Sequence, residues 1–164
     1  MKTGGRAPAE CSGLEVARFC ELVRAGGEVD EAGLRERVMR AERLVFSRDG
    51  DCIVGVAGLK NPYDEYRAGV FAKAGVSNPS DFPLELGWVF VVPERRGQGL
   101  SNGLVESGVA GVETGVFATS WVDNAAMHSG LRRYGFEQAG QPYESERSER
   151  KLLLFVRPGR PTRG

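Results

Sequence analysis

Residues 85–102 read ELGWVFVVPERRGQGLSN, and the interpretation of the whole chain starts from this stretch. An apolar run predicts a strand, and a helical pattern follows a turn that contains Arg95, Arg96, Gly97 and Gly99. The first N–H groups of a helix have no partner within the helix, and the helix dipole favours negative charge there. The glycines allow a ligand to approach the backbone closely, and the arginines add positive charge. This order of elements predicts a diphosphate-binding loop.

Two common phosphate loops do not fit this stretch. A P-loop requires Lys followed by Ser or Thr after its last glycine, and no such pair follows Gly99. The dinucleotide fingerprint requires the spacing G-x-G-x-x-G, but Asn102 occupies the place of the third glycine. Both motifs therefore fail on specific residues.

The stretch resembles the pyrophosphate loop of the GNAT acyltransferase superfamily, commonly written (Q/R)-x-x-G-x-(G/A). Arg96 and Gly99 match this motif, and Ser101 is a small residue at its last place. The Val-x-Pro-Glu turn of the family corresponds to residues 91–94. An Asn followed by a helix that ends in Gly-Phe corresponds to residues 124–136. The resemblance indicates the superfamily and leaves the substrate open.

The apolar patterns along the chain also predict its fold class. Helices are expected near residues 14–23, 30–43, 63–74, 98–111 and 124–134, and strands at 44–46, 52–59, 84–92, 116–121, from 136 onward and at 151–156. This order predicts an α/β (α+β) fold, and the resemblance implies that it is GNAT-like. Its central sheet should be mixed, mostly antiparallel, of about six to seven strands, with helices on both faces. A single acyltransferase domain is expected over residues 10–156, between flexible tails at 1–9 and 157–164 that are rich in Gly, Pro and Arg.

Composition narrows the classes of function. The 22 basic and 22 acidic residues give a net charge of zero, so no global field favours nucleic acid or an anionic membrane. Cys11, Cys20 and Cys52 form no C-x-x-C pair, and the chain has one His, so no metal site is expected. No apolar stretch approaches twenty residues, and a cytoplasmic monomer or homodimer is the expectation.

The resemblance implies that the chain binds coenzyme A and uses acetyl-CoA as its co-substrate. The residues expected to hold the diphosphate are Arg96, Gly97, Gln98, Gly99, Leu100 and Ser101. The pantetheine arm is then expected beside Val91 and Val92, where a backbone N–H near Val91 polarises the thioester carbonyl. Asn124 falls where the Asn of the family contacts the cofactor arm, and a plain helix N-cap is the alternative role.

Transfer to an amine requires a base, because an ammonium has no lone pair with which to attack. Glu85 is the candidate, because it lies six residues before Val91, where some branches of the superfamily carry a general-base Glu. Period-two alternation along a strand predicts that Glu85, Val89 and Val91 share one face. The alternatives are a structural Glu paired with an Arg and an exposed Glu at the start of the strand.

The general acid of the family is a Tyr seven residues after the Asn, and this chain has Leu131 there. His128 and Tyr134 each lie three residues from Leu131, so either could reach the thiolate from the same helical face. The alternatives are core packing for Tyr134 and an idle exposed position for His128. The thiolate of CoA can also leave without a protein acid.

Tyr63 and Tyr66 are expected to line the acceptor site, with the packing of a short helix as their alternative role. The predicted function is transfer of an acetyl group from acetyl-CoA to a primary amine of a small molecule or protein, by direct attack in a ternary complex. Two alternatives remain. One is a non-catalytic CoA-binding regulatory or interaction domain, which Leu131 favours. The other is a module that binds a nucleoside diphosphate.

Overall fold

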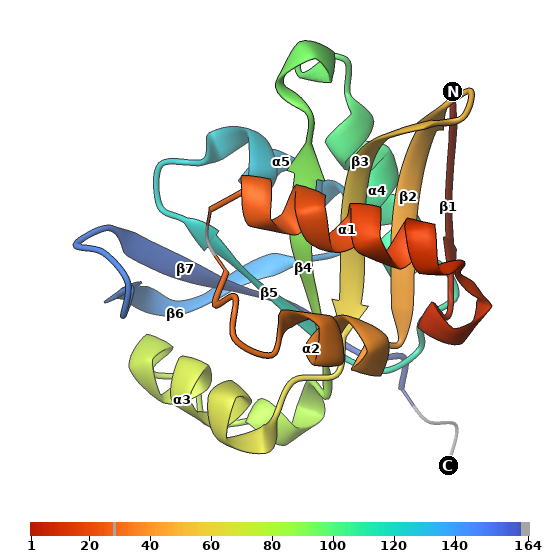
Figure 1. Ribbon diagram of the computed structural model, residues 1–164. Coiled ribbons are helices and arrows are strands. Elements are labelled where there is room, and N and C mark those ends of the chain that lie inside the picture. Colours follow the sequence, from red (N-terminus) through yellow and green to blue (C-terminus); the bar gives the residue numbers. More distant parts are fainter. Residues whose placement is uncertain (28, 162–164) are drawn as a thin grey trace. The chain divides into compact units, whose positions relative to one another are not determined.

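The computed structural model describes residues 1–27 and 29–161. Within these residues, seven strands form a mixed sheet in the order β1-β2-β3-β4-β5-β7-β6 (Figure 1). β4 and β5 run parallel, and the pairs β1–β2, β2–β3, β5–β7 and β6–β7 are antiparallel. The predicted mixed, mostly antiparallel sheet is therefore confirmed. The chain divides into two compact units, Met1–Asn61 with Leu86–Ala110 and Pro62–Glu85 with Gly111–Gly164.

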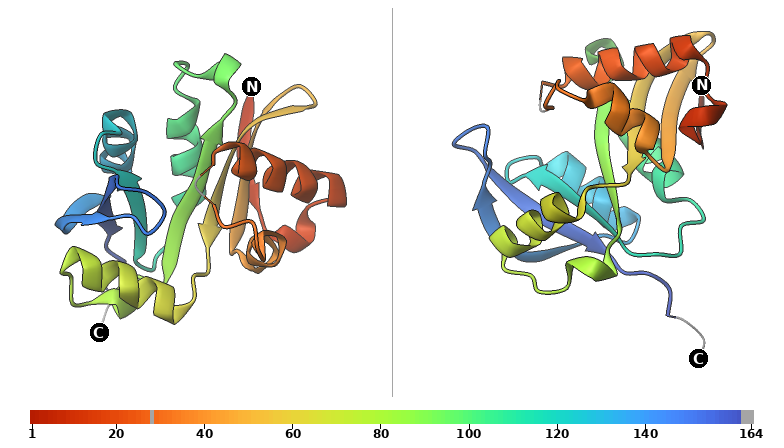
Figure 2. Two further views of the ribbon diagram at one scale, coloured as in Figure 1. Left: turned by 60° about the vertical axis from the view of Figure 1, so that its left-hand side comes forward. Right: turned by 60° about the horizontal axis from the view of Figure 1, so that its bottom comes forward.

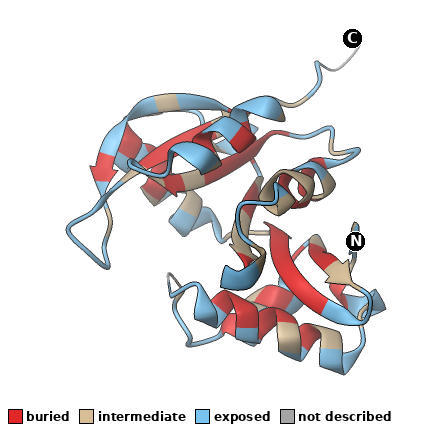
Figure 3. Cartoon of the chain, turned by 90° about the horizontal axis from the view of Figure 1, so that it is seen from above, coloured by how far each residue is buried: buried red, intermediate tan, exposed pale blue. Residues whose placement is uncertain are grey.

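The first unit packs helices against both faces of its strands. Its elements are β1 (Lys2–Arg6), a 3-10 turn (Pro8–Glu10), α1 (Gly13–Ala25), α2 (Leu34–Arg40), β2 (Arg43–Asp49), β3 (Cys52–Lys60), most of β4 (Leu84–Val91), a 3-10 turn (Pro93–Arg95) and α4 (Leu100–Val109). Phe19 of α1 packs edge-on against Phe46 of β2, with ring centroids 5.7 Å apart. On the other face, Leu104 of α4 is fully buried with Val45. Figure 3, coloured by burial, shows that buried residues follow the strands and that the helices carry both buried and exposed residues. The apolar spacing of each helix therefore produces its buried side.

The second unit is built around an aromatic cluster. Its elements are α3 (Asp64–Ala74), a 3-10 turn (Pro79–Asp81), the start of β4, β5 (Val116–Trp121), α5 (Ala125–Arg133), β6 (Glu137–Glu144) and β7 (Lys151–Arg157) (Figure 2). Phe71 of α3 stacks on Phe82 at 5.7 Å and meets Phe117 of β5 edge-on at 5.3 Å. On the other face, the ring of His128 in α5 lies 5.0 Å from that of Phe155 in β7.

The expected flexible tail at residues 1–9 is wrong for most of its length. Residues 2–6 form β1, which pairs antiparallel with β2, and the hydroxyls of Thr3 and the buried Ser47 lie 3.1 Å apart. An edge strand is held by backbone hydrogen bonds, so its glycines and exposed side chains give no apolar signal. At the other end, the backbone N–H of Arg160 donates to the carbonyl of Glu113 at 2.8 Å, and residues 162–164 lie outside the described residues.

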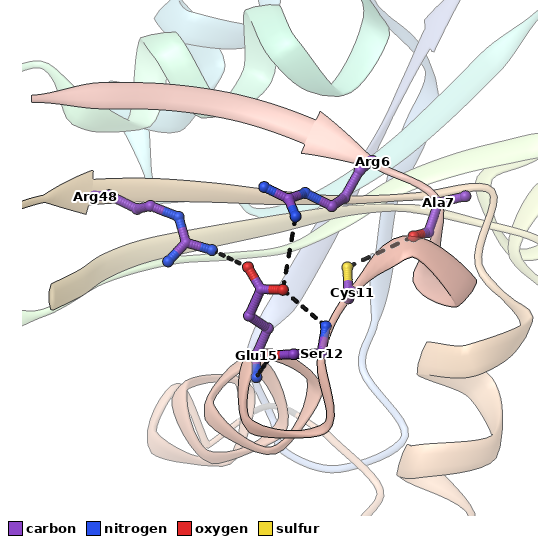
Figure 4. A network of polar contacts seen from close by, with 6 residues as sticks. All are labelled: Arg6, Ala7, Cys11, Ser12, Glu15 and Arg48. Atoms are coloured by element: carbon purple, nitrogen blue, oxygen red, sulfur yellow. Dashed lines mark hydrogen bonds and ion pairs between the residues drawn. The ribbon is translucent and has the colours of Figure 1, made fainter. Parts of the chain in front are cut away.

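Two helices start later than their sequence patterns suggest. The carboxylate of Asp30 accepts a hydrogen bond from the N–H of Ala32 at 3.1 Å, which makes a local turn, and α2 begins at Leu34. α4 begins at Leu100, because Gly97 and Gly99 both adopt positive φ and stand outside the helix. The N-terminus of α1 is instead well defined, since Ser12 and Glu15 form a capping box (Figure 4).

Strand β4 contains a backbone irregularity at Trp88. Its φ of 56° makes it the one non-glycine residue with positive φ among the described residues. The indole lies over Gly58 of β3, where an added Cβ would come within 2.5 Å of the ring. It also meets the ring of Phe19 edge-on at 5.8 Å. A residue in this conformation adds a bulge to the strand and changes which face the following side chains occupy.

Because of this bulge, the side chains of β4 do not alternate strictly between the two faces of the sheet, although the sequence predicts that they do. Leu86, before the bulge, lies against Gly108 of α4. Val91, five residues later, also lies on the α4 face, in a cluster with Leu104. Strict period-two alternation would put two residues of opposite parity on opposite faces. Glu85, next to Leu86, therefore does not share a face with Val89 and Val91.

Candidate functional site

The loop before α4 has the backbone that the sequence predicts. Gly97 and Gly99 have φ values of 79° and 76°, and no atom lies within 4 Å of the place where a Cβ would stand on either. Gly99 is the N-cap residue of α4, and it offers no side chain to cap the first N–H groups of the helix. Residues of the loop from Arg96 to Gly99 are exposed, and Leu100 and Ser101 are half-buried. Accessible N–H groups at a helix N-terminus suit an anionic ligand.

The two arginines of the loop differ in their partners. Arg95 forms an ion pair with Asp49 of β2, so its charge is already compensated. Arg96 donates from Nε to the carbonyl oxygen of Val91 at 3.0 Å, and its guanidinium lies 5.4 Å from the centroid of the Phe90 ring. The sequence gives both arginines the same role, but the contacts leave Arg96 as the cation for a ligand at this loop.

Val91 and Val92 are both buried at the end of β4. The N–H of Val92 donates to the carbonyl of Val54 in β3 at 2.9 Å, so this group is already engaged. The N–H near Val91 remains the candidate for the predicted contact with a thioester carbonyl.

Glu85 is buried where β4 begins, with only 3% of its surface exposed. Its Oε2 accepts a hydrogen bond from the hydroxyl of Tyr66 in α3 at 3.1 Å. Tyr66 is 45% exposed as a whole, but its hydroxyl end is turned inward to the carboxylate. The negative charge of Glu85, together with burial of the hydroxyl, raises the pKa of Tyr66. The structure thus joins the predicted base to one of the two predicted acceptor-site tyrosines.

Tyr143 of β6 is a further candidate site residue near Glu85, and it was not predicted from the sequence. It is 8% exposed, and its hydroxyl has no hydrogen-bond partner among the described residues. Burial, and then the charge of Glu85, raises the pKa of Tyr143. One signal was available in the sequence, because Tyr143 is the single aromatic residue of the polar segment EQAGQPYE (Glu137–Glu144). Tyr63, by contrast, is 55% exposed at the N-cap of α3.

Asn124 and His128 both have structural partners in the second unit. The side-chain oxygen of Asn124 accepts from the N–H of Met127 at 3.2 Å, which makes Asn124 the N-cap of α5. His128 is buried, and its Nε2 lies 2.8 Å from the carbonyl oxygen of Trp121. His128 is therefore not in the idle exposed position that was its alternative, and its role as an acid stays an untested prediction.

Leu131 and Tyr134 differ sharply in their surroundings. Leu131, at the place of the family's acid, is fully buried. Tyr134 ends α5 and is half-buried, and its carbonyl oxygen accepts from Nε of Arg157 at 3.1 Å. Of the two candidate acids, Tyr134 is therefore the more accessible.

Neither a metal site nor a membrane span is found in the part of the chain that the structure describes. No group of three or more His, Cys, Asp and Glu side chains gathers there in a way that could hold a metal ion. None of the helices in the same part combines the length and apolar character needed to cross a bilayer.

The comparisons with known proteins find similarity at the level of structure. No protein-family model matches the sequence, and no curated protein matches it either. The fold is similar to that of yncA from Salmonella typhimurium, solved with its cofactor acetyl-CoA, at 15% identity and a TM-score of 0.69, over 100% of this chain and 98% of the other. It is also similar to a GNAT-family acetyltransferase from Streptococcus agalactiae, at 15% identity and a TM-score of 0.65, over 97% and 96%. A third neighbour is NAA60 of Arabidopsis thaliana bound to a bisubstrate analogue, at 15% identity and a TM-score of 0.66, over 94% and 97%.

Proposed function

Because the chain has the GNAT fold, we propose that it is an N-acetyltransferase that uses acetyl-CoA to acetylate a primary amine of a small molecule or protein. The observation that carries this proposal is the loop at residues 96–101. Its glycines stand at positive φ with open space above them, directly before a helix N-terminus that no side chain caps. Such a loop fits the diphosphate of coenzyme A, and Arg96 supplies the nearby positive charge.

Glu85 is the proposed general base. It takes a proton from the ammonium of the acceptor, and the freed lone pair then attacks the carbonyl carbon of the thioester. A new C–N bond forms as the C–S bond breaks, and the sulfur leaves as a thiolate. The nitrogen, which becomes positively charged on attack, loses its second proton to solvent, and the product is the amide. Tyr66 is a positioning residue in this scheme, because its hydroxyl fixes one carboxylate oxygen of Glu85 at 3.1 Å.

The backbone N–H near Val91 is proposed to stabilise the negative charge that develops on the carbonyl oxygen. Protonation of the departing sulfur is assigned to Tyr134 or solvent, since the buried His128 is already in contact with the Trp121 carbonyl. A non-catalytic CoA-binding domain is the second candidate function, and the buried Leu131 at the usual place of the acid favours it.

Isothermal titration calorimetry with acetyl-CoA, and with ADP as the control, tests the first part of the proposal. Binding of acetyl-CoA without binding of ADP is the expected result. Equal binding of both would favour a nucleotide-binding module, and binding of neither would make the loop purely structural.

Release of the CoA thiol in the presence of a primary amine tests the second part. Ethanolamine, putrescine and alanine amide together sample small hydroxyl-bearing, dicationic and peptide-like acceptors. Amine-dependent thiol release supports the transferase. Binding of acetyl-CoA without such release from a wider panel of amines would indicate the non-catalytic domain.

A further inference from the structure

The Tyr143 hydroxyl is a buried polar group that has no hydrogen-bond partner within residues 1–27 and 29–161. Tyr143 is 8% exposed, and its oxygen makes no hydrogen bond to the described residues. A buried hydroxyl without a partner costs about 1–3 kcal/mol. Buried polar groups in folded proteins are nearly always hydrogen-bonded, so this exception requires an explanation.

Tyr143 lies on the same face of the sheet as Glu85. Its ring belongs to the apolar cluster beneath α3, together with Phe71 and Phe117. Glu85 is the register partner of Phe117 across the parallel β4–β5 pair, so the two side chains point to that same face. α3 also carries Tyr66, whose hydroxyl bonds to Glu85.

Three oxygen-bearing side chains from α3, β4 and β6 thus lie on the α3 side of the sheet, and they differ in the hydrogen bonds that they already make. Tyr66 donates its proton to Glu85, and Glu85 carries the charge. Only Tyr143, of the two tyrosines in this cluster, retains its hydroxyl for another molecule. Burial of the hydroxyl, and then the charge of Glu85, raises the pKa of Tyr143, so its hydroxyl stays neutral near pH 7.

We propose that Tyr143 is an acceptor-binding residue, whose hydroxyl oxygen accepts a hydrogen bond from the same amine nitrogen that gives its proton to Glu85. This inference rests on the proposed transferase function. Glu85 and Tyr143 together then offer two oxygen acceptors to one nitrogen. A primary ammonium has enough N–H groups for both, whereas an alcohol has a single proton. The site should therefore select primary amines over hydroxyl acceptors.

Steady-state kinetics of Tyr143→Phe test this role, with acetyl-CoA and whichever of ethanolamine, putrescine and alanine amide the wild type uses best. The variant keeps the ring in the cluster and removes one oxygen. We expect kcat/KM for the amine to fall about tenfold, as for loss of one neutral hydrogen bond, while KM for acetyl-CoA changes less than about twofold. Unchanged kcat/KM for the amine would overturn the proposal.

Ser120→Ala is the matched control. Ser120 of β5 is also buried, at 6% exposure, and its hydroxyl likewise has no partner among the described residues. Both variants should keep or slightly raise the melting temperature, because each removes a buried unsatisfied hydroxyl. Only Tyr143→Phe should affect the amine. An equal effect of the two variants on kcat/KM would show that packing, and not binding, is responsible.

A measurement without turnover separates this inference from the proposed function. The melting temperature is recorded with and without the same three amines, in the absence and presence of CoA. Stabilisation of the wild type and Ser120→Ala, but not of Tyr143→Phe, supports the site even if no acetyl transfer is found. If no amine stabilises the wild type and none is acetylated, Tyr143 does not bind an acceptor.

Discussion

The loop at residues 96–101 presents backbone N–H groups to a ligand, whereas the cluster around Glu85 presents side-chain oxygens. The loop is a continuous segment in which glycine geometry matters most, with φ of 79° and 76° at Gly97 and Gly99. The cluster joins Tyr66, Glu85 and Tyr143, which come from α3, β4 and β6.

This contrast predicts different responses to substitution. A backbone site depends on conformation and tolerates many side chains, as long as the turn keeps its shape. A side-chain site depends on single atoms, so removal of one oxygen or one charge changes its chemistry while the fold persists. Substitutions in the loop should therefore act on cofactor affinity, and substitutions in the cluster on turnover and acceptor binding.

The largest expected effect is on turnover, in Glu85→Gln. The amide cannot take a proton from an ammonium, so kcat at neutral pH should fall by about 10²-fold or more. Affinity for acetyl-CoA should stay nearly constant, because the loop is unchanged. Steady-state kinetics and calorimetry measure the two quantities separately. Glu113→Gln, which loses only an exposed pair with Arg160, is the control. An equal loss of affinity and turnover in Glu85→Gln would break the contrast between the regions.

The next effect is on cofactor affinity, in Gly99→Val. A β-branched residue at φ 76° carries a conformational cost of about 1–2 kcal/mol, so the loop should change shape. Affinity for acetyl-CoA should fall at least about tenfold, by calorimetry. Gly27→Val is the matched control, since Gly27 also has φ 76° and open space around it. It should lower stability similarly and leave affinity intact. Equal affinity losses in both variants would mean that general strain weakens binding.

The sequence was most informative where the site is continuous in the chain. The motif at residues 96–101 predicted the glycine turn and the helix that follows it, because both are local consequences of six consecutive residues. The strands β4 and β5 were also predicted nearly to their ends, since each is an apolar run. The helices α3 and α5 were predicted equally well, because Gly75 ends α3 and because Asn124 and Gly135 bound α5.

The sequence was least informative where partners are distant. Nothing near Tyr143 in the chain indicates that its hydroxyl is buried in the same cluster as Glu85, because three strand pairings decide which side chains share that face. The bulge at Trp88 was equally hidden, since positive φ at a tryptophan follows no sequence rule and here accompanies packing over Gly58. β1 was missed because backbone pairing, and not its side chains, holds it.

Alkaline pH probes the cluster separately from the loop, because the loop binds through backbone groups. The pKa of Tyr143 is raised by burial and by the charge of Glu85, and an unfolded tyrosine ionises near pH 10. Below about pH 10 the hydroxyl is neutral in both the folded and the unfolded protein, so its titration costs no stability. Above that value the unfolded tyrosine ionises first, and stability falls by up to about 1.4 kcal/mol per pH unit. Urea unfolding at pH 9, 10 and 11 measures this slope. Tyr143→Phe should have a shallower slope than the wild type, and identical slopes would mean that Tyr143 ionises freely in the folded protein.

The smallest expected effect is on the free energy of unfolding, and it concerns Glu15, which has both a neighbouring and a distant set of partners (Figure 4). Its carboxylate accepts from the backbone N–H of Ser12 at 2.8 Å and pairs with Arg48 and, at 3.7 Å, with Arg6. The N–H of Ser12, and then the charges of Arg6 and Arg48, lower the pKa of Glu15. The resulting stability is present above the ordinary Glu pKa and is lost as the pH falls through the lowered one.

Ser12→Ala should cost about 1 kcal/mol in the free energy of urea unfolding at pH 7, because it removes the cap. Glu15→Gln keeps a capping box, which also accepts Gln, and loses only the charge pairs, so about 0.5 kcal/mol or less is expected. The loss of stability between pH 5 and pH 3 should also be smaller in Glu15→Gln than in the wild type. A larger cost for Glu15→Gln than for Ser12→Ala would mean that the distant arginines contribute more here than the consecutive residues of the cap. Contacts between residues distant in the chain would then outweigh contacts between neighbouring residues in the first unit as well, and the contrast between the loop and the cluster would not be general.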